Sequence, residues 1–333
     1  MKILVTGGSG FLGQQLIAAL LAQPRFELHD AAGRPAQPQI DSIVAFDRTA
    51  GVLGDPRVNY VTGDIGEPRA LEPLVDRDTG IVVHLAAVVS GTAEADFDLG
   101  MRVNVDGTPA AMRACRAAGN QPRVLFSSSV AVFGGDLPPV VTDATPPTPQ
   151  GSYGIQKLIG ELLVQDYTRK GFIDGRSVRV PTVVVRPGLP NGAASGFASG
   201  IIREPLAGHE AVLPVPPQTE MWVASPRAVI AMFLHALRLS PQQWGWHRSL
   251  NLPGLTVSMT EAIDALRRIG GDQVVGRIRP QPDESVMRLV RTWAPRFDTA
   301  RAVAMGFRAD RDFDSIVTGY IEDNPSAVVG RRA

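Results

Sequence analysis

A tyrosine and a lysine four positions apart form the pattern in this sequence that is best suited to proton transfer. They occur as Tyr153-Gly-Ile-Gln-Lys157, and on a helix this spacing places the phenol and the ammonium one turn apart on one face. A free phenol has a pKa near 10, and a neighbouring cation is expected to lower that pKa. The pair predicts a general base for a hydroxyl group, although an isolated pattern of this kind also occurs on ordinary helix surfaces.

A glycine-rich turn near the start of the chain predicts a dinucleotide site. Residues 2–13 are KILVTGGSGFLG, an apolar run, a turn and the start of an amphipathic helix. Glycines at these positions allow a tight turn, close approach of a diphosphate and close packing of helix against strand. A turn without a ligand is the alternative interpretation. The predicted cofactor contacts in this turn are Gly7, Gly10, Phe11, Leu12 and Gly13.

An acidic residue at the end of the second predicted strand favours NAD over NADP. Asp47 can accept hydrogen bonds from ribose hydroxyls and would repel a 2′-phosphate. Arg48 follows it directly and keeps NADP open, because a guanidinium can bind that phosphate. Asp47 lies farther than usual from Gly13, which we attribute to a proline-containing surface insertion at residues 23–39.

The elements that must position these residues alternate between short apolar runs and longer amphipathic segments. This alternation predicts an α/β fold with a Rossmann-type, doubly wound parallel sheet whose strands are buried on both faces. The expected strands are 3–6, 42–46, 58–62, 81–85, 123–127 and 178–185, and the expected helices are 11–21, 67–75, 98–118 and 152–170. Ser127, Ser128 and Ser129 then fall at the carboxyl edge of the sheet, where such folds bind ligands.

The alternation breaks up after Pro187, where glycines and prolines become frequent. We therefore expect a cofactor-binding domain over residues 1–187 and, over 188–333, a smaller substrate-covering region, parts of which return to the main sheet. Its expected helices are 197–207, 227–239, 260–269 and 285–293, with strands at 249–252 and 274–278.

The composition excludes several other classes of protein. The 33 lysines and arginines match 33 aspartates and glutamates, so no net charge attracts nucleic acid or an anionic membrane. Cys115 is the only cysteine, and the five histidines are scattered, so we expect neither a disulfide nor a metal site. No apolar stretch approaches the ~20 residues of a membrane span, and the start of the chain lacks a signal-peptide pattern. The expected location is cytoplasmic.

The order of motifs resembles the extended short-chain dehydrogenase/reductase family, the NAD-dependent epimerase/dehydratase-like group, over nearly the whole chain. The matching motifs are TGGSGFLG at 6–13, GDI at 63–65, VVHLAA at 82–87, NVDGT at 104–108, SSSVAVFG at 127–134, YGIQK at 153–157 and RPG at 186–188.

The resemblance implies a role for each matching residue. Ser129 would supply the catalytic hydroxyl, Tyr153 the acid/base, and Lys157 would also bind the nicotinamide ribose. The other implied cofactor contacts are Asp64 and Ile65 beside the adenine, Ala86 and Ala87 along the cofactor, and Asn104 as a support near the active site.

Other residues favour one branch of that family. Dehydratases carry an Asp-Glu pair directly after the catalytic hydroxyl, whereas this chain has Val130 and Ala131, which cannot transfer protons. The segment 186–208 resembles the branch that oxidises a small sugar acid, D-erythronate, at C2 to the 2-oxo acid. Hydrogen bonds and a paired carboxylate must hold so small a substrate. The predicted substrate contacts are Ser90, Ser129, Tyr153, Asn191 and Arg203.

Two alternatives stay open. One is an epimerase or reductase of the same family acting on a nucleotide-linked sugar, and the other is a regulator that binds NAD without chemistry. For each of these functions, the sugar-acid dehydrogenase included, the resemblance implies a homodimer that pairs through the helices expected at 98–118 and 152–170.

Overall fold

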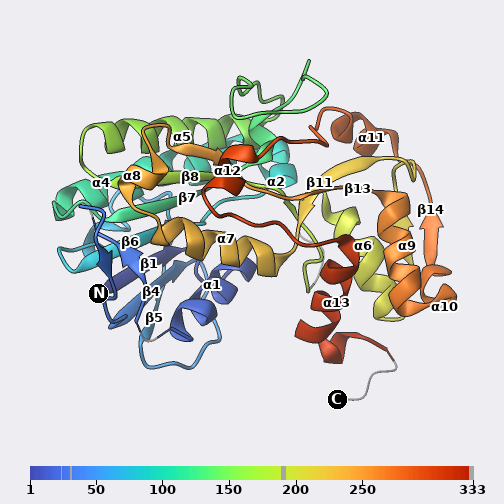
Figure 1. The fold of residues 1–333 in the computed structure, drawn as a ribbon, viewed down its shortest axis with the longest axis horizontal. Helices are drawn as coiled ribbons and strands as arrows, with labels where there is room; N and C mark the ends of the chain where they lie inside the picture. Colours follow the sequence, from blue (N-terminus) through green and yellow to red (C-terminus); the bar gives the residue numbers. More distant parts are fainter. Residues whose placement is uncertain (24, 31, 189–192, 330–333) are drawn as a thin grey trace.

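A seven-stranded parallel sheet forms the centre of the molecule (Figure 1). The computed structural model describes residues 1–23, 25–30, 32–188 and 193–329. The strand order is β12-β8-β7-β6-β1-β4-β5. From β1 the chain adds strands on one side as far as β5, and it then crosses over to add β6 and the later strands on the other side of β1. This confirms the Rossmann-type fold class. The strands are β1 (Lys2–Thr6), β4 (Ser42–Asp47), β5 (Val58–Thr62), β6 (Thr79–His84), β7 (Arg123–Ser129), β8 (Asp174–Val180) and β12 (Ser249–Asn251).

Helices cover both faces of this sheet (Figure 1). On one face, α1 (Phe11–Leu21) and α7 (Pro226–Arg238) pack on alternate strand residues such as Ile3 and Val5. On the other face, α4 (Gly107–Ala118) and α5 (Ser152–Arg169) pack on the intervening strand residues, such as Leu4. Because both faces are buried, the strands are continuously apolar rather than alternating.

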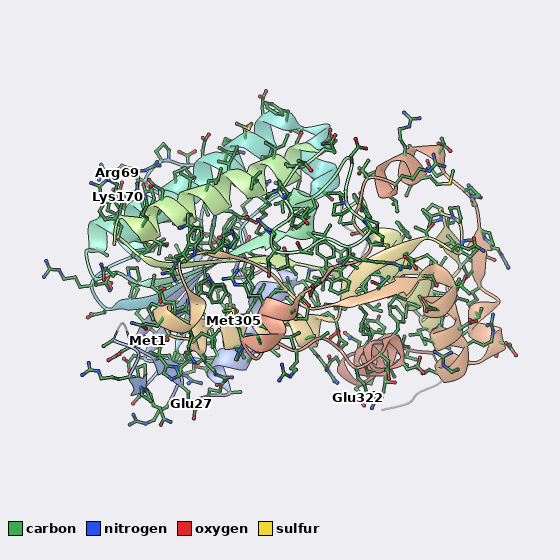
Figure 2. The ribbon with its side chains drawn as sticks, turned by 45° about the horizontal axis from the view of Figure 1, so that its top comes forward. Met1, Glu27, Arg69, Lys170, Met305 and Glu322 are labelled. Atoms are coloured by element: carbon green, nitrogen blue, oxygen red, sulfur yellow. The ribbon has the colours of Figure 1, made fainter. Side chains whose placement is uncertain are left out.

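The later part of the chain builds a second core, at the right of Figure 1. Its helices are α6 (Gly196–Leu206), α9 (Met259–Gly270), α10 (Asp272–Val275), α11 (Glu284–Val290) and α13 (Phe313–Asp323). Its strands form the sheet β13 (Leu255–Ser258), β11 (Glu220–Ala224) and β9 (Thr182–Val183), and the pair β10 (Ala211–Leu213) and β14 (Ile278–Pro280). Figure 2 shows the side chains of both regions, with Lys170 after α5 in the first and Glu322 of α13 in the second.

Several later segments, including α7 and β12, pack into the main core rather than the second one. A division of the chain into two domains at residue 187 therefore stays a prediction, and segments from the later part of the chain contribute to the first core. The short elements that connect the others are β2 (Leu28–His29), β3 (Pro35–Ala36), η1 (Glu72–Leu74), α2 (Ser90–Ala95), α3 (Phe97–Gly100), the π-helical η2 (Met101–Asp106), η3 (Val130–Val132), α8 (Pro241–Trp244), α12 (Ala300–Ala304) and η4 (Pro325–Ala327).

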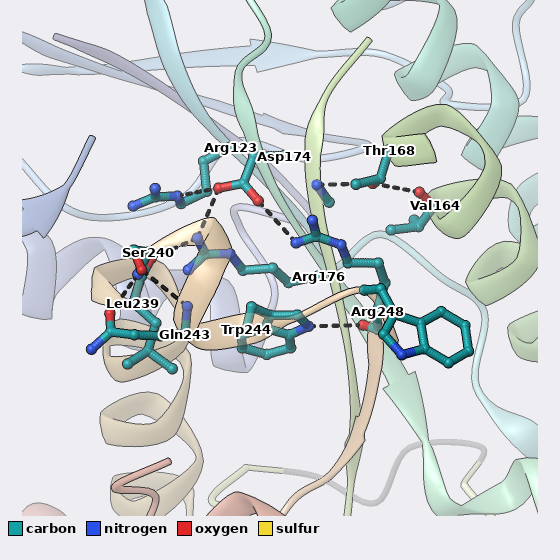
Figure 3. Close-up of polar contacts among 12 residues, drawn as sticks. Arg123, Val164, Thr168, Asp174, Arg176, Leu239, Ser240, Gln243, Trp244 and Arg248 are labelled. Atoms are coloured by element: carbon teal, nitrogen blue, oxygen red, sulfur yellow. Dashed lines mark hydrogen bonds and ion pairs between the residues drawn. The ribbon is translucent and has the colours of Figure 1, made fainter. Parts of the chain in front are cut away.

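A cluster of arginines around Asp174 anchors α7 to the sheet (Figure 3). The Asp174 carboxylate pairs with Arg123 at 2.9 Å, Arg176 at 2.8 Å and Arg248 at 3.2 Å. Arg176 also donates to the carbonyls of Ala236 and Leu239, and Arg123 to that of Leu237. Three cations at one carboxylate are tolerated because the carbonyls at the end of α7 carry partial negative charge.

Three expected elements were wrong, and prolines explain two of the differences. The helix expected at 67–75 is reduced to η1, because Pro68 and Pro73 interrupt it. The strand expected at 178–185 divides at Pro181, after which β9 joins the other sheet. The strand expected at 274–278 starts as α10.

Within the part of the chain that the structure describes, no helix combines the length and the apolar character needed to span a membrane.

Candidate active site

One cavity of about 550 Å³ runs from the glycine turn, past the carboxyl ends of the central strands, to the second core. It lies at the point where the strand order reverses, which is where open parallel sheets bind ligands. Most residues predicted for the site line it: Gly7, Gly10, Phe11, Leu12, Gly13, Asp47, Asp64, Ile65, Ala86, Ala87, Ser90, Ser129, Tyr153, Lys157 and Arg203. Asn104 is not in its wall, and Asn191 lies outside the described residues.

The glycine turn has the close packing that a diphosphate cradle requires. Gly7 has a φ of +71°, and a side chain there would come within 2.8 Å of the Ala86 nitrogen. A side chain at Gly13 would lie 2.1 Å from the Gly7 oxygen, so α1 packs directly on the turn. Gly10 precedes the first residue of α1, whose free N–H groups favour an anion. These residues fit the diphosphate of NAD.

The Asp47 carboxylate is held at the end of β4 by two backbone groups. It accepts hydrogen bonds from the N–H of Ser9 at 3.0 Å and the N–H of Arg48 at 2.7 Å. The first bond ties β4 to the glycine turn. Asp47 and Arg48 both line the cavity, so selection of NAD by Asp47 stays a prediction.

Asp64 has a partner that sequence reasoning missed. Its carboxylate accepts hydrogen bonds from Arg102 at 2.5 Å and from the Gly66 N–H at 2.9 Å, and both lower the pKa of Asp64. The carboxylate is therefore fixed beside Ile65 in the cavity wall.

Asn104 connects the cofactor side of the site to α5. Its amide bonds both backbone groups of Val88, at 2.9 and 3.1 Å, and donates to Gln156 at 2.7 Å. Gln156 precedes Lys157, so Asn104 braces the loop after β6 against the helix that carries the predicted base. The π-helical turn η2 places Asn104 there.

A buried hydrogen-bond chain runs through His84, to which the sequence assigned no role. The Thr108 hydroxyl donates to the Asn104 carbonyl at 2.8 Å, so it accepts from His84 Nε2 at 3.1 Å. His84 Nδ1 then accepts from the Thr6 hydroxyl at 2.7 Å, and Thr6 in turn accepts from the Ala86 N–H at 3.3 Å. Burial lowers the pKa of His84 to about 3, as does the charge of Lys157, so the ring is neutral.

Tyr153 and Lys157 lie one turn apart near the start of α5, as the spacing predicted. Lys157 Nζ is 5.5 Å from the centroid of the Tyr153 ring and donates to the Ser127 carbonyl at 2.8 Å. The Ser129 hydroxyl accepts from the Ala131 N–H at 3.1 Å. The structure thus brings the three predicted catalytic residues to one end of the cavity.

The pKa of Tyr153 moves in the direction opposite to the one expected. Burial raises it to about 12, and a hydrogen bond with Ser129 and the charge of Arg186 offset only part of that rise. Burial also lowers the pKa of Lys157 to about 8. Desolvation of the charged form dominates for both groups, and Lys157 is not among the groups that lower the pKa of Tyr153.

Arg186 is a cavity residue that the sequence analysis did not single out, although it begins the RPG motif. Its backbone is fixed by the Ser199 hydroxyl, at 3.3 Å from its N–H, and by Arg203, which donates to its carbonyl at 2.8 Å. Its guanidinium has no hydrogen bond or ion pair to any residue that the structure describes. Burial lowers the pKa of Arg186, and repulsion from Arg203 adds to the effect.

The predicted substrate contacts Arg203 and Ser90 line the cavity with their polar groups engaged. Arg203 pairs with both carboxylate oxygens of Glu204, at 2.7 and 2.6 Å, and its side chain is 10% exposed. The Ser90 hydroxyl accepts from the Ala194 N–H at 3.4 Å. Their contact with substrate stays a prediction.

Apolar residues from the later part of the chain also line the cavity, and the sequence analysis missed them too. Met221, Trp222 and Trp293 lie in its wall. Trp222 is fixed by a bond from its indole N–H to Leu252, at 3.4 Å. No local sequence signal marks these residues, because only the packing of β11 and the loop after α11 brings them to the site.

A buried ion pair supports the catalytic end from behind. Arg179 of β8 donates to both oxygens of Glu161, at 2.9 and 2.7 Å, and the Ser128 hydroxyl donates to the same carboxylate at 2.6 Å. Ser128 precedes Ser129, and Glu161 lies one turn beyond Lys157. The pair thus joins β7, β8 and α5 where the predicted catalytic residues lie.

Comparison with known proteins shows the family of this chain. The model of the NAD dependent epimerase/dehydratase family matches residues 3–222. D-erythronate dehydrogenase of Cupriavidus necator is 51% identical over 97% of this chain and 98% of its own, and that of Haemophilus influenzae is 41% identical over 97% and 99%. A crystal structure described as the nucleoside-diphosphate-sugar epimerase from Agrobacterium tumefaciens is 40% identical, with a TM-score of 0.89 over 98% of this chain and 95% of that one. With the family model covering most of the cofactor site and two relatives matching almost end to end, the chain belongs to the NAD dependent epimerase/dehydratase family.

Proposed function

We propose that this protein is an NAD-dependent dehydrogenase that oxidises D-erythronate at C2 to 2-oxo-D-erythronate. The observation that carries the proposal is the single cavity that joins the glycine turn to Ser129, Tyr153 and Lys157. The names of the two curated relatives, both matched over nearly their whole length, support the choice of substrate.

Each residue has a distinct part in this proposal. NAD, when bound, supplies the hydride acceptor that oxidation at C2 needs. The glycine turn and the start of α1 would hold its diphosphate, Asp47 its adenosine ribose and Lys157 its nicotinamide ribose. Ser129 would orient the substrate hydroxyl, and Tyr153 Oη would take its proton as the carbonyl forms.

A purified enzyme incubated with NAD and a panel of four- and five-carbon aldonates tests the proposal. D-erythronate is expected to give net accumulation of NADH, followed by absorbance, together with one equivalent of 2-oxo acid. The Tyr153→Phe variant is the matched control, because it removes only the phenolic oxygen. Full activity of that variant would exclude Tyr153 as the base.

The second candidate is a nucleotide-sugar epimerase, which is favoured by the description of the similar Agrobacterium structure. Interconversion of a nucleotide sugar without net NADH would support it. Binding of NAD without turnover of any aldonate or nucleotide sugar would favour the other alternative, a regulator that binds NAD without chemistry.

We also propose a cytoplasmic homodimer. Ile155 and Leu162, seven residues apart on α5, are 48% and 63% exposed, and Phe97 of α3, a helix that contacts α5, is 58% exposed. Such an apolar stripe on a helix favours a partner surface. Light scattering of the parent and of Leu162→Asp tests the dimer, and cell fractionation tests the location.

A further inference from the structure

The substrate end of the cavity carries positive charge that no acidic residue of its wall balances. The described wall contains two acids, Asp47 and Asp64, and both lie at the cofactor end. The opposite end has Lys157, Arg186 and Arg203. Residues 189–192 are Leu-Pro-Asn-Gly, so they add no acid. This end of the site is suited to an anionic group.

Two of these three cations already have partners. Arg203 is neutralised by the two oxygens of Glu204, and Lys157 donates to the Ser127 carbonyl and lies over the ring of Phe126, at 5.0 Å. Arg186 differs because its guanidinium has no partner among residues 1–23, 25–30, 32–188 and 193–329. A half-buried guanidinium without an anion is costly, and a bound anion would remove that cost.

We propose that Arg186 binds the carboxylate of the substrate and thereby makes the enzyme selective for 2-hydroxy acids. The inference rests on the proposed function, since it concerns the substrate of that same site. Arg186 is a substrate-binding residue in this proposal, and Arg203 holds it in place through the bond to its carbonyl at 2.8 Å.

The position of Arg186 relative to Tyr153 decides between two kinds of anion. Both side chains line the same cavity, and the charge of Arg186 acts to lower the pKa of Tyr153. An anion on Arg186 therefore lies close to the carbon that reacts beside Tyr153. In a 2-hydroxy acid the carboxylate is bonded directly to that carbon, whereas a sugar ring separates a nucleotide's diphosphate from a reacting ring carbon. The planar guanidinium also matches a carboxylate with two parallel hydrogen bonds.

The test compares D-erythronate with its neutral amide as substrates for the parent and for Arg186→Gln. Loss of a partly buried charge pair is expected to cost at least about thirtyfold in kcat/KM for the acid. The amide should change less than about threefold, so that the preference for the acid over the amide collapses. Arg186→Lys keeps the charge without the planar guanidinium, so its kcat/KM for the acid should lie between those of the parent and of Arg186→Gln.

Arg279→Gln is the matched control, because it makes the same substitution at an exposed arginine that pairs with Glu210 and does not line the cavity. It is expected to retain the preference for the acid over the amide. An unchanged preference in Arg186→Gln, with the parent active on D-erythronate, would overturn this inference and leave the proposed function standing. Weakened binding of uridine diphosphate alone in Arg186→Gln would assign the residue to a diphosphate instead. A parent that produces no NADH from D-erythronate would contradict the proposed function itself.

Discussion

Lys157 Nζ lies 2.8 Å from the carbonyl oxygen of Ser127 and 5.5 Å from the ring centroid of Tyr153. This contact fixes the ammonium at the carboxyl end of β7, beside the predicted base. Because burial lowers the pKa of Lys157 to about 8, the residue is both positioned and partly deprotonated within the physiological range.

Replacement of Lys157 by methionine is expected to weaken both binding of NAD and turnover. Methionine fills a similar volume but cannot donate to Ser127 or to a ribose hydroxyl. We expect kcat/KM to fall about 100-fold or more, in line with the loss of a group that supports acid–base catalysis. Calorimetric titration with NAD should show a higher Kd in the variant, with circular dichroism as the control for folding. Unchanged Kd and kcat/KM would remove Lys157 from the site.

The rate of oxidation is expected to rise about tenfold per pH unit up to about pH 8 and to level off above it. Below pH 8 the phenolate fraction of Tyr153 grows with pH, since its pKa is raised to about 12. Above pH 8, loss of the Lys157 ammonium cancels that gain. Arginine at position 157 stays charged, so the Lys157→Arg profile should keep rising past pH 8. A bend at the same pH in that variant would assign it to another group.

Replacement of Asp47 by alanine is expected to relax the preference for NAD. The carboxylate that would repel a 2′-phosphate disappears, while Arg48 remains to bind it. The ratio of kcat/KM for NAD to that for NADP should fall at least about tenfold. Arg48→Ala is the matched control and should move the ratio the other way. Equal ratios in the parent and Asp47→Ala would show that cofactor choice lies elsewhere.

The buried pair of Glu161 and Arg179 is expected to contribute more to stability than an exposed pair. Alanine at position 161 leaves Arg179 charged and unpaired and deprives Ser128 of its acceptor. The expected cost is about 3–5 kcal/mol in the free energy of unfolding, measured with urea. Glu72→Ala breaks the exposed pair with Arg69 and should cost less than about 1 kcal/mol. Similar costs for both variants would contradict the argument.

His84 is expected to make the fold sensitive to mild acid. Its folded pKa is lowered to about 3, below the value of about 6.5 in an unfolded chain. The unfolded state therefore binds the proton first, and stability is lost as the pH falls from about 6.5 towards 3, by at most about 1.4 kcal/mol per pH unit from this group. His84→Gln should show a shallower loss over the same window, in urea titrations at several pH values.

The sequence was sufficient for the central sheet and for the glycine turn because these follow from local pattern. Strands buried on both faces are continuously apolar, and the Tyr153 to Lys157 spacing is set by one helical turn. The chain carried no comparable signal for β9, β11 and β13, which are short and meet only through long-range pairing.

The same limit applies to charges at the site. Arg186 and Arg203 look alike in the sequence, and only the fold shows that Glu204 neutralises one of them. The direction of the Tyr153 pKa was missed for a related reason, since burial is a property of the folded chain. The spacing along the helix predicted that Lys157 lies beside Tyr153, but not that both side chains are buried away from solvent.

The return of α7 and β12 to the central sheet has a consequence for synthesis of the chain. Until residue 251 has left the ribosome, β8 lacks its neighbouring strand β12. The sheet face that carries α1 also lacks α7 until that helix has been made. The nascent nucleotide-binding half must therefore wait for about sixty further residues before it can close. A truncated chain ending at 187 would expose the aliphatic side chains beneath α7, so we expect it to aggregate rather than to fold as a minimal cofactor-binding module.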